Sequence, residues 1–162
     1  TSIALQGLLN QTIDGGYMFA AFSVLGDGGE DTSRIFSVNN TGGSDGDSQS
    51  AIFSLRNNTN PNDLFSYSAQ WISAHPQMFD DDNGDILHES LIKNGTQKSL
   101  VNNSGVTNQS NVTTISAEEF NIVSNATGFS NSAIDLDYLA LFDASITDAQ
   151  ADDVRNYINN TP

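Results

Sequence analysis

The fold is decided by a nine-residue apolar stretch, YMFAAFSVL, at residues 17–25. Its large apolar side chains fall on both alternating faces, which is typical of a central strand covered on two sides. Shorter runs with strand character lie around it, at residues 34–38, 50–55, 64–67, 70–73, 86–92, 120–123 and 133–142. In the last of these runs, alternation predicts one apolar face, formed by Ile134, Leu136, Tyr138, Ala140 and Phe142. These runs predict an all-β protein.

The clearest hairpin is LIKNGTQKSL, at residues 91–100. Asn94 and Gly95 tolerate the positive φ angles that a type I′ turn requires. The next stretch, residues 101–114, is rich in Asn, Ser, Thr and Gly and has no periodicity. We therefore expect a long loop or weak edge strands there.

One helix is expected near the end of the sequence. Thr147 as N-cap and Gln150 three residues later form a capping box, and Ile146 can staple over Ala151. The helix should run from Asp148 to about residue 158. Its apolar stripe is predicted to contain Val154, Tyr157 and Ile158, and its water-facing side Asp152, Asp153, Arg155 and Asn156.

The length and composition exclude several classes of protein. The 162 residues fit one domain, so we expect residues 1–162 to form a single domain. Five Lys and Arg against 20 Asp and Glu give a net charge of −15, which excludes nucleic-acid binding because phosphates are repelled. Without Cys the fold has no disulfide. No apolar run approaches the roughly 18 residues of a membrane span, so no membrane insertion is expected.

Two segments resemble a known family. LIKNGT, at residues 91–96, is similar to the "YvNG" hairpin of laminin-G-like and concanavalin A-like domains. Residues 120–158 resemble the closing segment of those domains, with Ile134–Tyr138 (IDLDY) in the "G-x-I-D-x-v" strand and Ile146–Gln150 (ITDAQ) at the start of the helix. The resemblance implies an all-β, two-sheet antiparallel jelly-roll-like sandwich with one short C-terminal α-helix. Because such domains usually carry further strands before the equivalent of residues 17–25, this one is expected to be short at its N-terminus or to complete a sheet with a neighbour.

No set of catalytic residues emerges from the sequence. Residues 42–46 match G-x-S-x-G around Ser44, but a nucleophile elbow needs a helix after it, and residues 50–55 read as a strand. The only two histidines, His75 and His88, are interpreted as structural or surface residues. The paired Glu residues of related glucanases have no counterpart. We therefore predict that the protein is not an enzyme.

Calcium is the one cofactor that the sequence suggests. The acidic stretch DDDNGD, residues 80–85, offers hard oxygen ligands of the kind Ca²⁺ prefers, on Asp80, Asp82, Asn83 and Asp85. The stretch lacks the spacing of an EF-hand, and the alternative interpretation is a solvated acidic loop.

A glycan site is predicted at Tyr67, Trp71 and His75. Lectins stack an aromatic ring on the apolar face of a sugar and bind its hydroxyl groups with polar side chains. The alternative interpretation is that Tyr67 and Trp71 simply pack in the core.

These features lead to two hypotheses about function. The first is a non-enzymatic, surface-displayed structural or adhesive module, as a bacteriophage virion component such as a capsid decoration, fibre or tail protein, by analogy with virion appendages of this fold. The second is a secreted, carbohydrate-binding lectin module that could depend on calcium. The expected partners are virion or surface proteins or glycans, and the expected location is the virion surface or extracellular space. Strand addition at a sheet edge would allow an oligomer.

Overall fold

The computed structural model describes residues 5–24, 33–39, 51–56, 64–68, 71–75, 85–93, 95–102, 104–109, 115–122 and 134–160. The side chains of some strand residues within these ranges, among them Tyr67, Trp71 and His75, lie outside the description. No described helix is long and apolar enough to cross a bilayer.

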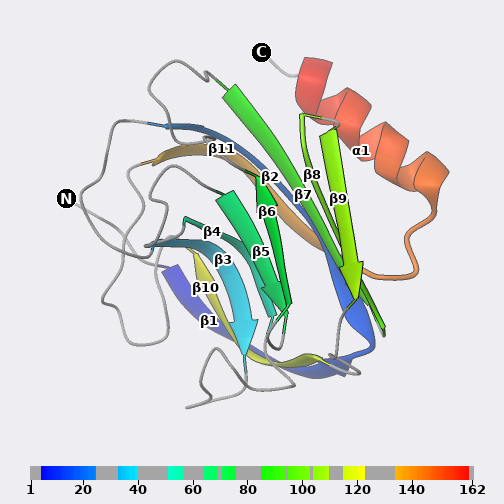
Figure 1. The fold of residues 1–162 in the computed structure, drawn as a ribbon. Helices are drawn as coiled ribbons and strands as arrows, with labels where there is room; N and C mark the ends of the chain where they lie inside the picture. The colour runs from blue at the N-terminus through cyan, green and yellow to red at the C-terminus, as the bar shows by residue number, and fades with distance from the viewer. Residues whose placement is uncertain are drawn as a thin grey trace.

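The described residues form two antiparallel sheets that face each other, with one helix on the outside (Figure 1). In spatial order, the six-stranded sheet contains β1 (Leu5–Ile13), β10 (Ile115–Ile122), β3 (Ser33–Asn39), β4 (Ala51–Arg56), β5 (Leu64–Ser68) and β6 (Trp71–His75). The five-stranded sheet contains β11 (Ile134–Asp143), β2 (Gly15–Val24), β7 (Asp85–Lys93), β8 (Thr96–Val101) and β9 (Ser104–Gln109). The helix is α1 (Asp148–Asn160). The predicted two-sheet sandwich with a C-terminal helix is confirmed.

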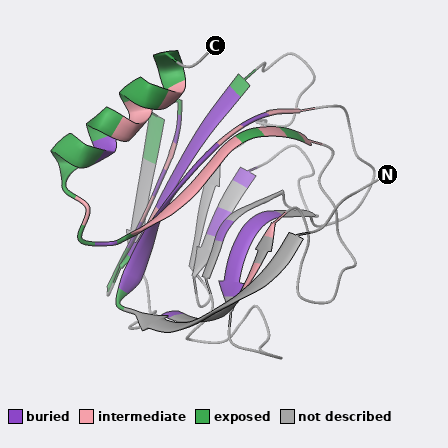
Figure 2. Ribbon diagram, turned by 180° about the vertical axis from the view of Figure 1, so that it is seen from behind, coloured by how far each residue is buried: buried purple, intermediate pink, exposed green. Residues whose placement is uncertain are grey.

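Strand β2 is buried on both faces, as the opening stretch predicts (Figure 2). Met18, Ala20 and Phe22 point between the sheets and join the main core with residues such as Phe53 of β4. Tyr17 and Phe19 point the other way and are buried beneath α1 with Ala151. An apolar side chain at nearly every position of this strand is therefore needed, because one face meets a sheet and the other meets a helix.

The capping box fixes the start of α1. The backbone amide of Gln150 donates to Thr147 Oγ1 at 3.3 Å, and the backbone amide of Thr147 donates to Gln150 Oε1 at 2.9 Å. Ala151 is fully buried, and Ile146, Val154 and Ile158 pack around it on the outer face of the five-stranded sheet. The helix begins at Asp148 as predicted and ends at Asn160.

Two strands extend the predicted set. Strand β1 precedes the central strand and pairs with β10, so one strand comes before the equivalent of residues 17–25. Strand β9 falls in residues 101–114 and pairs with β8 at one edge of the sheet, which confirms the edge-strand interpretation. The predicted hairpin joins β7 to β8, and Gly95 has a φ of 78°, while Asn94 lies outside the described residues.

Candidate functional site

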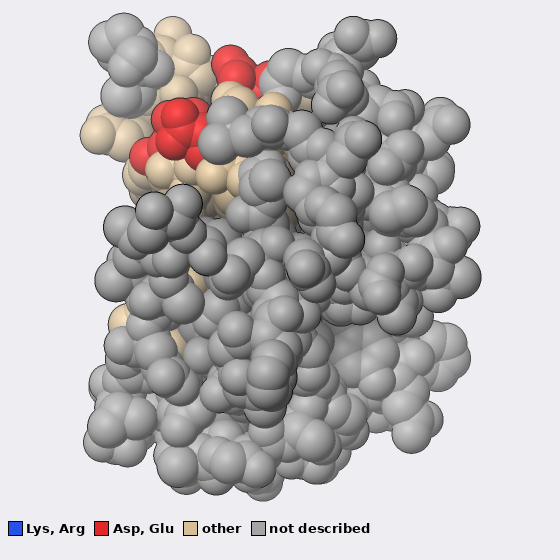
Figure 3. Space-filling view, turned by 90° about the vertical axis from the view of Figure 1, so that its left-hand side faces the viewer, with Lys and Arg blue, Asp and Glu red and all other residues tan. Residues whose placement is uncertain are grey.

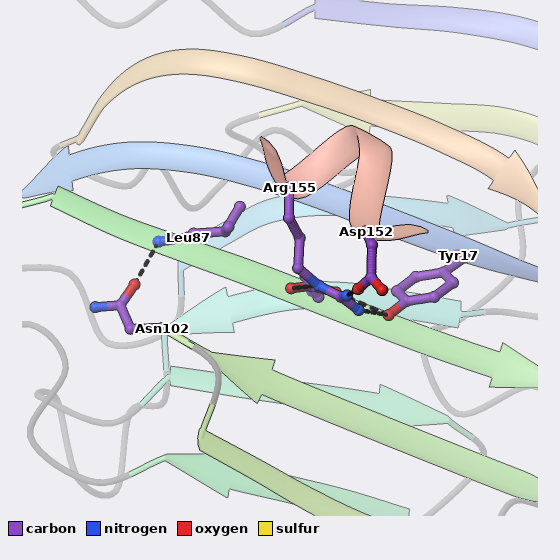
Figure 4. A network of polar contacts seen from close by, with 6 residues as sticks. Tyr17, Leu87, Asn102, Asp152 and Arg155 are labelled. Carbon is purple, nitrogen blue, oxygen red and sulfur yellow. Dashed lines mark hydrogen bonds and ion pairs between the residues drawn. The ribbon is translucent and has the colours of Figure 1, made fainter. Parts of the chain in front are cut away.

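A buried polar network holds α1 on the outer face of the sheet (Figure 4). The Tyr17 hydroxyl donates to Glu89 Oε2 at 2.7 Å, and Arg155 Nε donates to Glu89 Oε1 at 2.7 Å. Arg155 Nη2 also donates to the Tyr17 hydroxyl at 3.1 Å, and Arg155 Nη1 pairs with Asp152 one turn earlier. The prediction that Arg155 faces water was wrong. Arg155 lies four residues after the buried Ala151, at the border of the apolar stripe of α1, and its side chain extends to Glu89 on β7.

The network shifts the protonation of two of its members. Burial raises the pKa of the Tyr17 hydroxyl well above its ordinary value, and the hydrogen bond to the Glu89 carboxylate raises it further. The hydrogen bond to Glu89 also raises the pKa of Arg155, against the opposing effect of burial. The neutral tyrosine and the charged guanidinium are therefore the forms that the folded protein favours.

Beside the last turn of α1, the outer face of the sheet carries a cleft of about 570 Å³. Its described walls come from β2, β7, β11 and α1, together with the residue that follows β8. The residues among them with a polar group are Asp85, Asn102, Asp137, Tyr138, Tyr157 and Asn159. We call this the helix-end cleft.

A β-bulge in β11 supplies two of these groups. Leu136 pairs with Phe22 and Tyr138 with Ala21, which leaves Asp137 as an extra residue in β11. The bulge sends Leu136 into the main core and Tyr138 to the helix side. The predicted single apolar face of β11 was therefore wrong, because the bulge exchanges the two faces partway along the strand.

Two carboxylates, Asp85 and Asp137, line the cleft, and a third lies nearby. Asp135, Ser23 and Asp85 stand opposite one another across β11, β2 and β7, and Ser23 Oγ donates to Asp85 Oδ1 at 2.7 Å. The described lining residues include no Lys or Arg. Acidic side chains and no basic ones also appear in the described part of the face drawn in Figure 3. The described lining of the cleft is therefore negatively charged.

Two tyrosines form the other wall. The ring of Tyr157 on α1 lies 6.1 Å from that of Tyr138 on β11, with 56° between the ring planes. Tyr157 was predicted to belong to the apolar stripe of α1, but 61% of it is exposed and it does not join the buried cluster beneath the helix. The residues of α1 that pack against the sheet are instead Ala151, Val154 and Ile158.

Asn102 closes the cleft on the β8 side. It has a φ of 47°, its backbone amide donates to the Leu87 carbonyl at 3.0 Å, and its side-chain oxygen accepts from the Leu87 amide at 2.9 Å (Figure 4). Asn102 directly follows the last pair of the β7–β8 ladder, and its two hydrogen bonds hold it against Leu87, another lining residue of the cleft. The helix-end cleft was not predicted from the sequence, because Asp137 and Tyr138 lie in a run whose alternation looks regular and only the pairing with β2 reveals the bulge.

The residues predicted for the glycan and calcium sites are only partly described. The backbones of Tyr67, Trp71 and His75 lie in paired strands β5 and β6, at the edge of the six-stranded sheet. Asp80, Asp82 and Asn83 lie outside the described residues, whereas Asp85 is the first residue of β7. Within the described part of the chain, no three His, Cys, Asp or Glu side chains are grouped to hold a metal. Calcium binding by residues 80–85 and glycan binding at Tyr67, Trp71 and His75 stay predictions.

His88 is a structural residue, as the sequence interpretation has it. Its side chain is fully buried, and its Nε2 atom lies 2.9 Å from Ser99 Oγ and 3.2 Å from Ser66 Oγ. Ser66 Oγ also lies 3.2 Å from Ser99 Oγ, so the cluster links β5 of one sheet to β7 and β8 of the other. The Ser–His contact resembles a nucleophile–base pair, but substrate has no access to it. Ser44 lies outside the described residues.

Solved structures share this fold at low sequence identity. Domains LG4-5 of the mouse laminin alpha1 chain match with a TM-score of 0.60 and 10% identity, over 85% of this chain and 38% of that one. A heptameric SAP-like pentraxin from Limulus polyphemus matches with a TM-score of 0.56 and 15% identity, over 89% of this chain and 71% of that one. The protein has a laminin-G-like, concanavalin A-like jelly-roll fold.

A third match is a Trypanosoma rangeli sialidase in complex with sialic acid, with a TM-score of 0.62 and 9% identity over 90% of this chain and 23% of that one. The chain thus spans less than half of the laminin chain and about a quarter of the sialidase. No protein-family model matches the sequence, and no curated protein matches it. Because a laminin, a pentraxin and a sialidase share the fold, the fold alone does not determine the function.

Proposed function

We propose that this protein is a non-enzymatic, extracellular adhesive module that binds glycans in the helix-end cleft. The observation that carries the proposal is the meeting of two tyrosine rings with two carboxylates in one open cleft of about 570 Å³. That volume lies within the range of about 300–1,000 Å³ that is usual for small-ligand sites. Sugars have apolar ring faces and hydroxyl edges, so they need this combination of aromatic and polar groups.

Each group of the cleft has a distinct task in this proposal. The exposed ring of Tyr157 offers a stacking surface for a pyranose, and Tyr138 supports it from β11. Asp85 is oriented by the hydrogen bond from Ser23 and accepts hydrogen bonds from sugar hydroxyls, as does Asp137. These groups sit on paired strands and a capped helix, so the cleft is largely formed before the ligand arrives.

Two observations support a binding role over catalysis. The Ser66–His88–Ser99 cluster is buried between the sheets, where a glycan has no access. The Glu89 carboxylate, which could serve as an acid or base, is occupied by Tyr17 and Arg155.

The setting in which the module is displayed is also proposed. Display on a bacteriophage particle is the first choice, as a decoration, fibre or tail component, and a secreted bacterial lectin is the second. In the first case, its protein partners are other virion proteins. Mass spectrometry of purified particles tests this part: detection in intact particles supports virion display, and detection only in the medium contradicts it.

A glycan-array screen of the folded protein tests the binding proposal. We expect specific hits that Tyr157→Ala abolishes and that Asn156→Ala, an exposed neighbour on the same helix, preserves. Loss of the hits in Trp71→Ala with retention in Tyr157→Ala would move the site to β5 and β6. A blank array for the wild-type protein would overturn the proposed function. Thermal melting of each variant confirms that it is folded.

A further inference from the structure

We infer that the glycan bound in the helix-end cleft carries a protonated amine, as an amino sugar does. This inference rests on the proposed function and names the ligand class of the same cleft. It follows from the sign of the charges around the cleft and from the hydrogen-bonding capacity of the groups that line it.

The negative charge of the cleft has no basic counterpart among the described lining residues. Asp85 and Asp137 line it, and Asp135 lies two strands from Asp85 in the same cross-strand row. The Arg155 side chain is engaged by Glu89 and Asp152 beneath the helix. Lys93 lies at the opposite end of β7, eight residues from Asp85, which is about 26 Å along an extended strand. A cationic group of the ligand would therefore be the natural counter-charge.

The carboxylates also restrict the kind of polar group that a ligand can present. An ionised carboxylate only accepts hydrogen bonds, so the facing group must be a donor. A hydroxyl donates one hydrogen bond, whereas an ammonium group donates three and carries the opposite charge. The faces of Tyr138 and Tyr157 add attraction for a cation close to them. Uronic, sialic and sulfated sugars would bring a further negative charge against Asp85 and Asp137.

A bare metal ion is a poorer occupant for this cleft than an ammonium group. Calcium takes six to eight oxygen ligands, and its sites usually draw on several carboxylates and carbonyls. Within the described residues no three metal-binding side chains are grouped. The two tyrosine rings, in contrast, suit an organic cation carried on a sugar ring.

Isothermal titration calorimetry with matched disaccharides tests the inference. The probes are a β-1,4-linked glucosamine disaccharide with free amines, its N-acetylated counterpart and a uronic-acid disaccharide, at a pH where the amine is protonated. We expect the amine form to bind about tenfold more tightly than the N-acetylated form, on the scale of one partly screened ion pair. The uronic-acid form should be the weakest ligand.

Three variants with the same change in net charge separate the cleft from the acidic surface as a whole. Asp85→Asn and Asp137→Asn should bring the ratio between the amine and N-acetylated forms close to one. Asp14→Asn should preserve the ratio, because Asp14 is exposed at the far end of β2. If the affinity for the amine form fell equally in all three variants, the acidic surface as a whole would attract the amine, and the inference would be overturned.

Two further outcomes keep this inference separate from the proposed function. If the N-acetylated form binds as well as the amine form and Tyr157→Ala still abolishes binding, the amine inference fails and the glycan site remains. If no glycan binds, the proposed function itself fails. Ethylamine that competes at the same concentration as the disaccharide would show that the sugar ring contributes nothing, which overturns the assignment to an amino sugar.

Discussion

Arg155 on α1 and Glu89 on β7 form an ion pair at 2.7 Å, although 66 residues separate them in the sequence. Only 1% of the Glu89 side chain and 19% of the Arg155 side chain are exposed. A buried carboxylate is costly unless it is paired and hydrogen-bonded, and Tyr17 and Arg155 together meet that requirement. The position of α1, and with it one wall of the helix-end cleft, therefore depends on this pair.

Replacing Arg155 by Met should lower the free energy of unfolding by about 3–5 kcal/mol, because it leaves the buried Glu89 charge without its partner. Chemical denaturation monitored by circular dichroism measures this. The double variant Glu89→Gln with Arg155→Met should recover a large part of the loss, since the buried charge is then gone.

Asp152→Asn is the matched control for the ion-pair network. Asp152 is exposed, so its removal should cost less than about 1 kcal/mol. A loss in Asp152→Asn as large as that in Arg155→Met would contradict the central place of the Arg155–Glu89 pair.

The raised pKa of Tyr17 predicts sensitivity to alkali. Above pH 10.0, the ordinary pKa of tyrosine, the unfolded chain releases the Tyr17 proton while the folded protein retains it. The unfolded state then binds fewer protons, so the stability of the folded state falls by up to about 1.4 kcal/mol per pH unit. Below pH 10.0 this group gives no pH dependence.

Tyr17→Phe isolates that contribution. Near neutral pH, the free energy of unfolding of the variant should be about 1–2 kcal/mol lower than that of the wild type, because Glu89 loses one hydrogen bond. The difference should narrow as the pH rises above 10.0, since the phenylalanine has no proton to lose. A difference that stays constant up to the alkaline unfolding transition would contradict the raised pKa.

The sequence predicted those features that depend on local pattern. The two-sided burial of β2, the hairpin around Gly95 and the capping box of Thr147 and Gln150 are all set by neighbours within a few residues. Such signals follow from periodicity and turn chemistry, so they can be recognised without knowing the rest of the fold.

The features that the sequence did not predict depend on contacts between distant segments. The bulge in β11 breaks an alternation that looks regular from Ile134 to Phe142, and only the pairing with β2 places it at Asp137. In the sequence, Arg155 resembles an ordinary surface residue of a helix, and only the folded structure places the buried Glu89 beneath it. The helix-end cleft combines four elements and an asparagine, so no single stretch of sequence carries its signature.

Removing the cap of α1 should loosen the first turn of the helix. Thr147→Ala deletes the hydroxyl that accepts from the Gln150 amide and should destabilise the protein by about 1 kcal/mol. Thr147→Ser keeps that hydroxyl and should stay within a few tenths of a kcal/mol of the wild type. Hydrogen exchange should show faster exchange in the first turn of α1 for Thr147→Ala alone; equal exchange in both variants would mean that packing of Ala151 fixes the helix start.

The predicted calcium site at Asp80, Asp82, Asn83 and Asp85 can be tested apart from the helix-end cleft. A ligand that binds only the folded state at 100 times its Kd raises the free energy of unfolding by about 2.7 kcal/mol. Calcium should therefore raise the melting temperature of the wild type, EDTA should reverse the rise, and Asp82→Asn should reduce it. Asp14→Asn, with the same change in charge, should keep the full response. If EDTA leaves the melting temperature of the wild type unchanged, residues 80–85 are a solvated acidic loop, and Asp85 contributes to ligand binding only through the helix-end cleft.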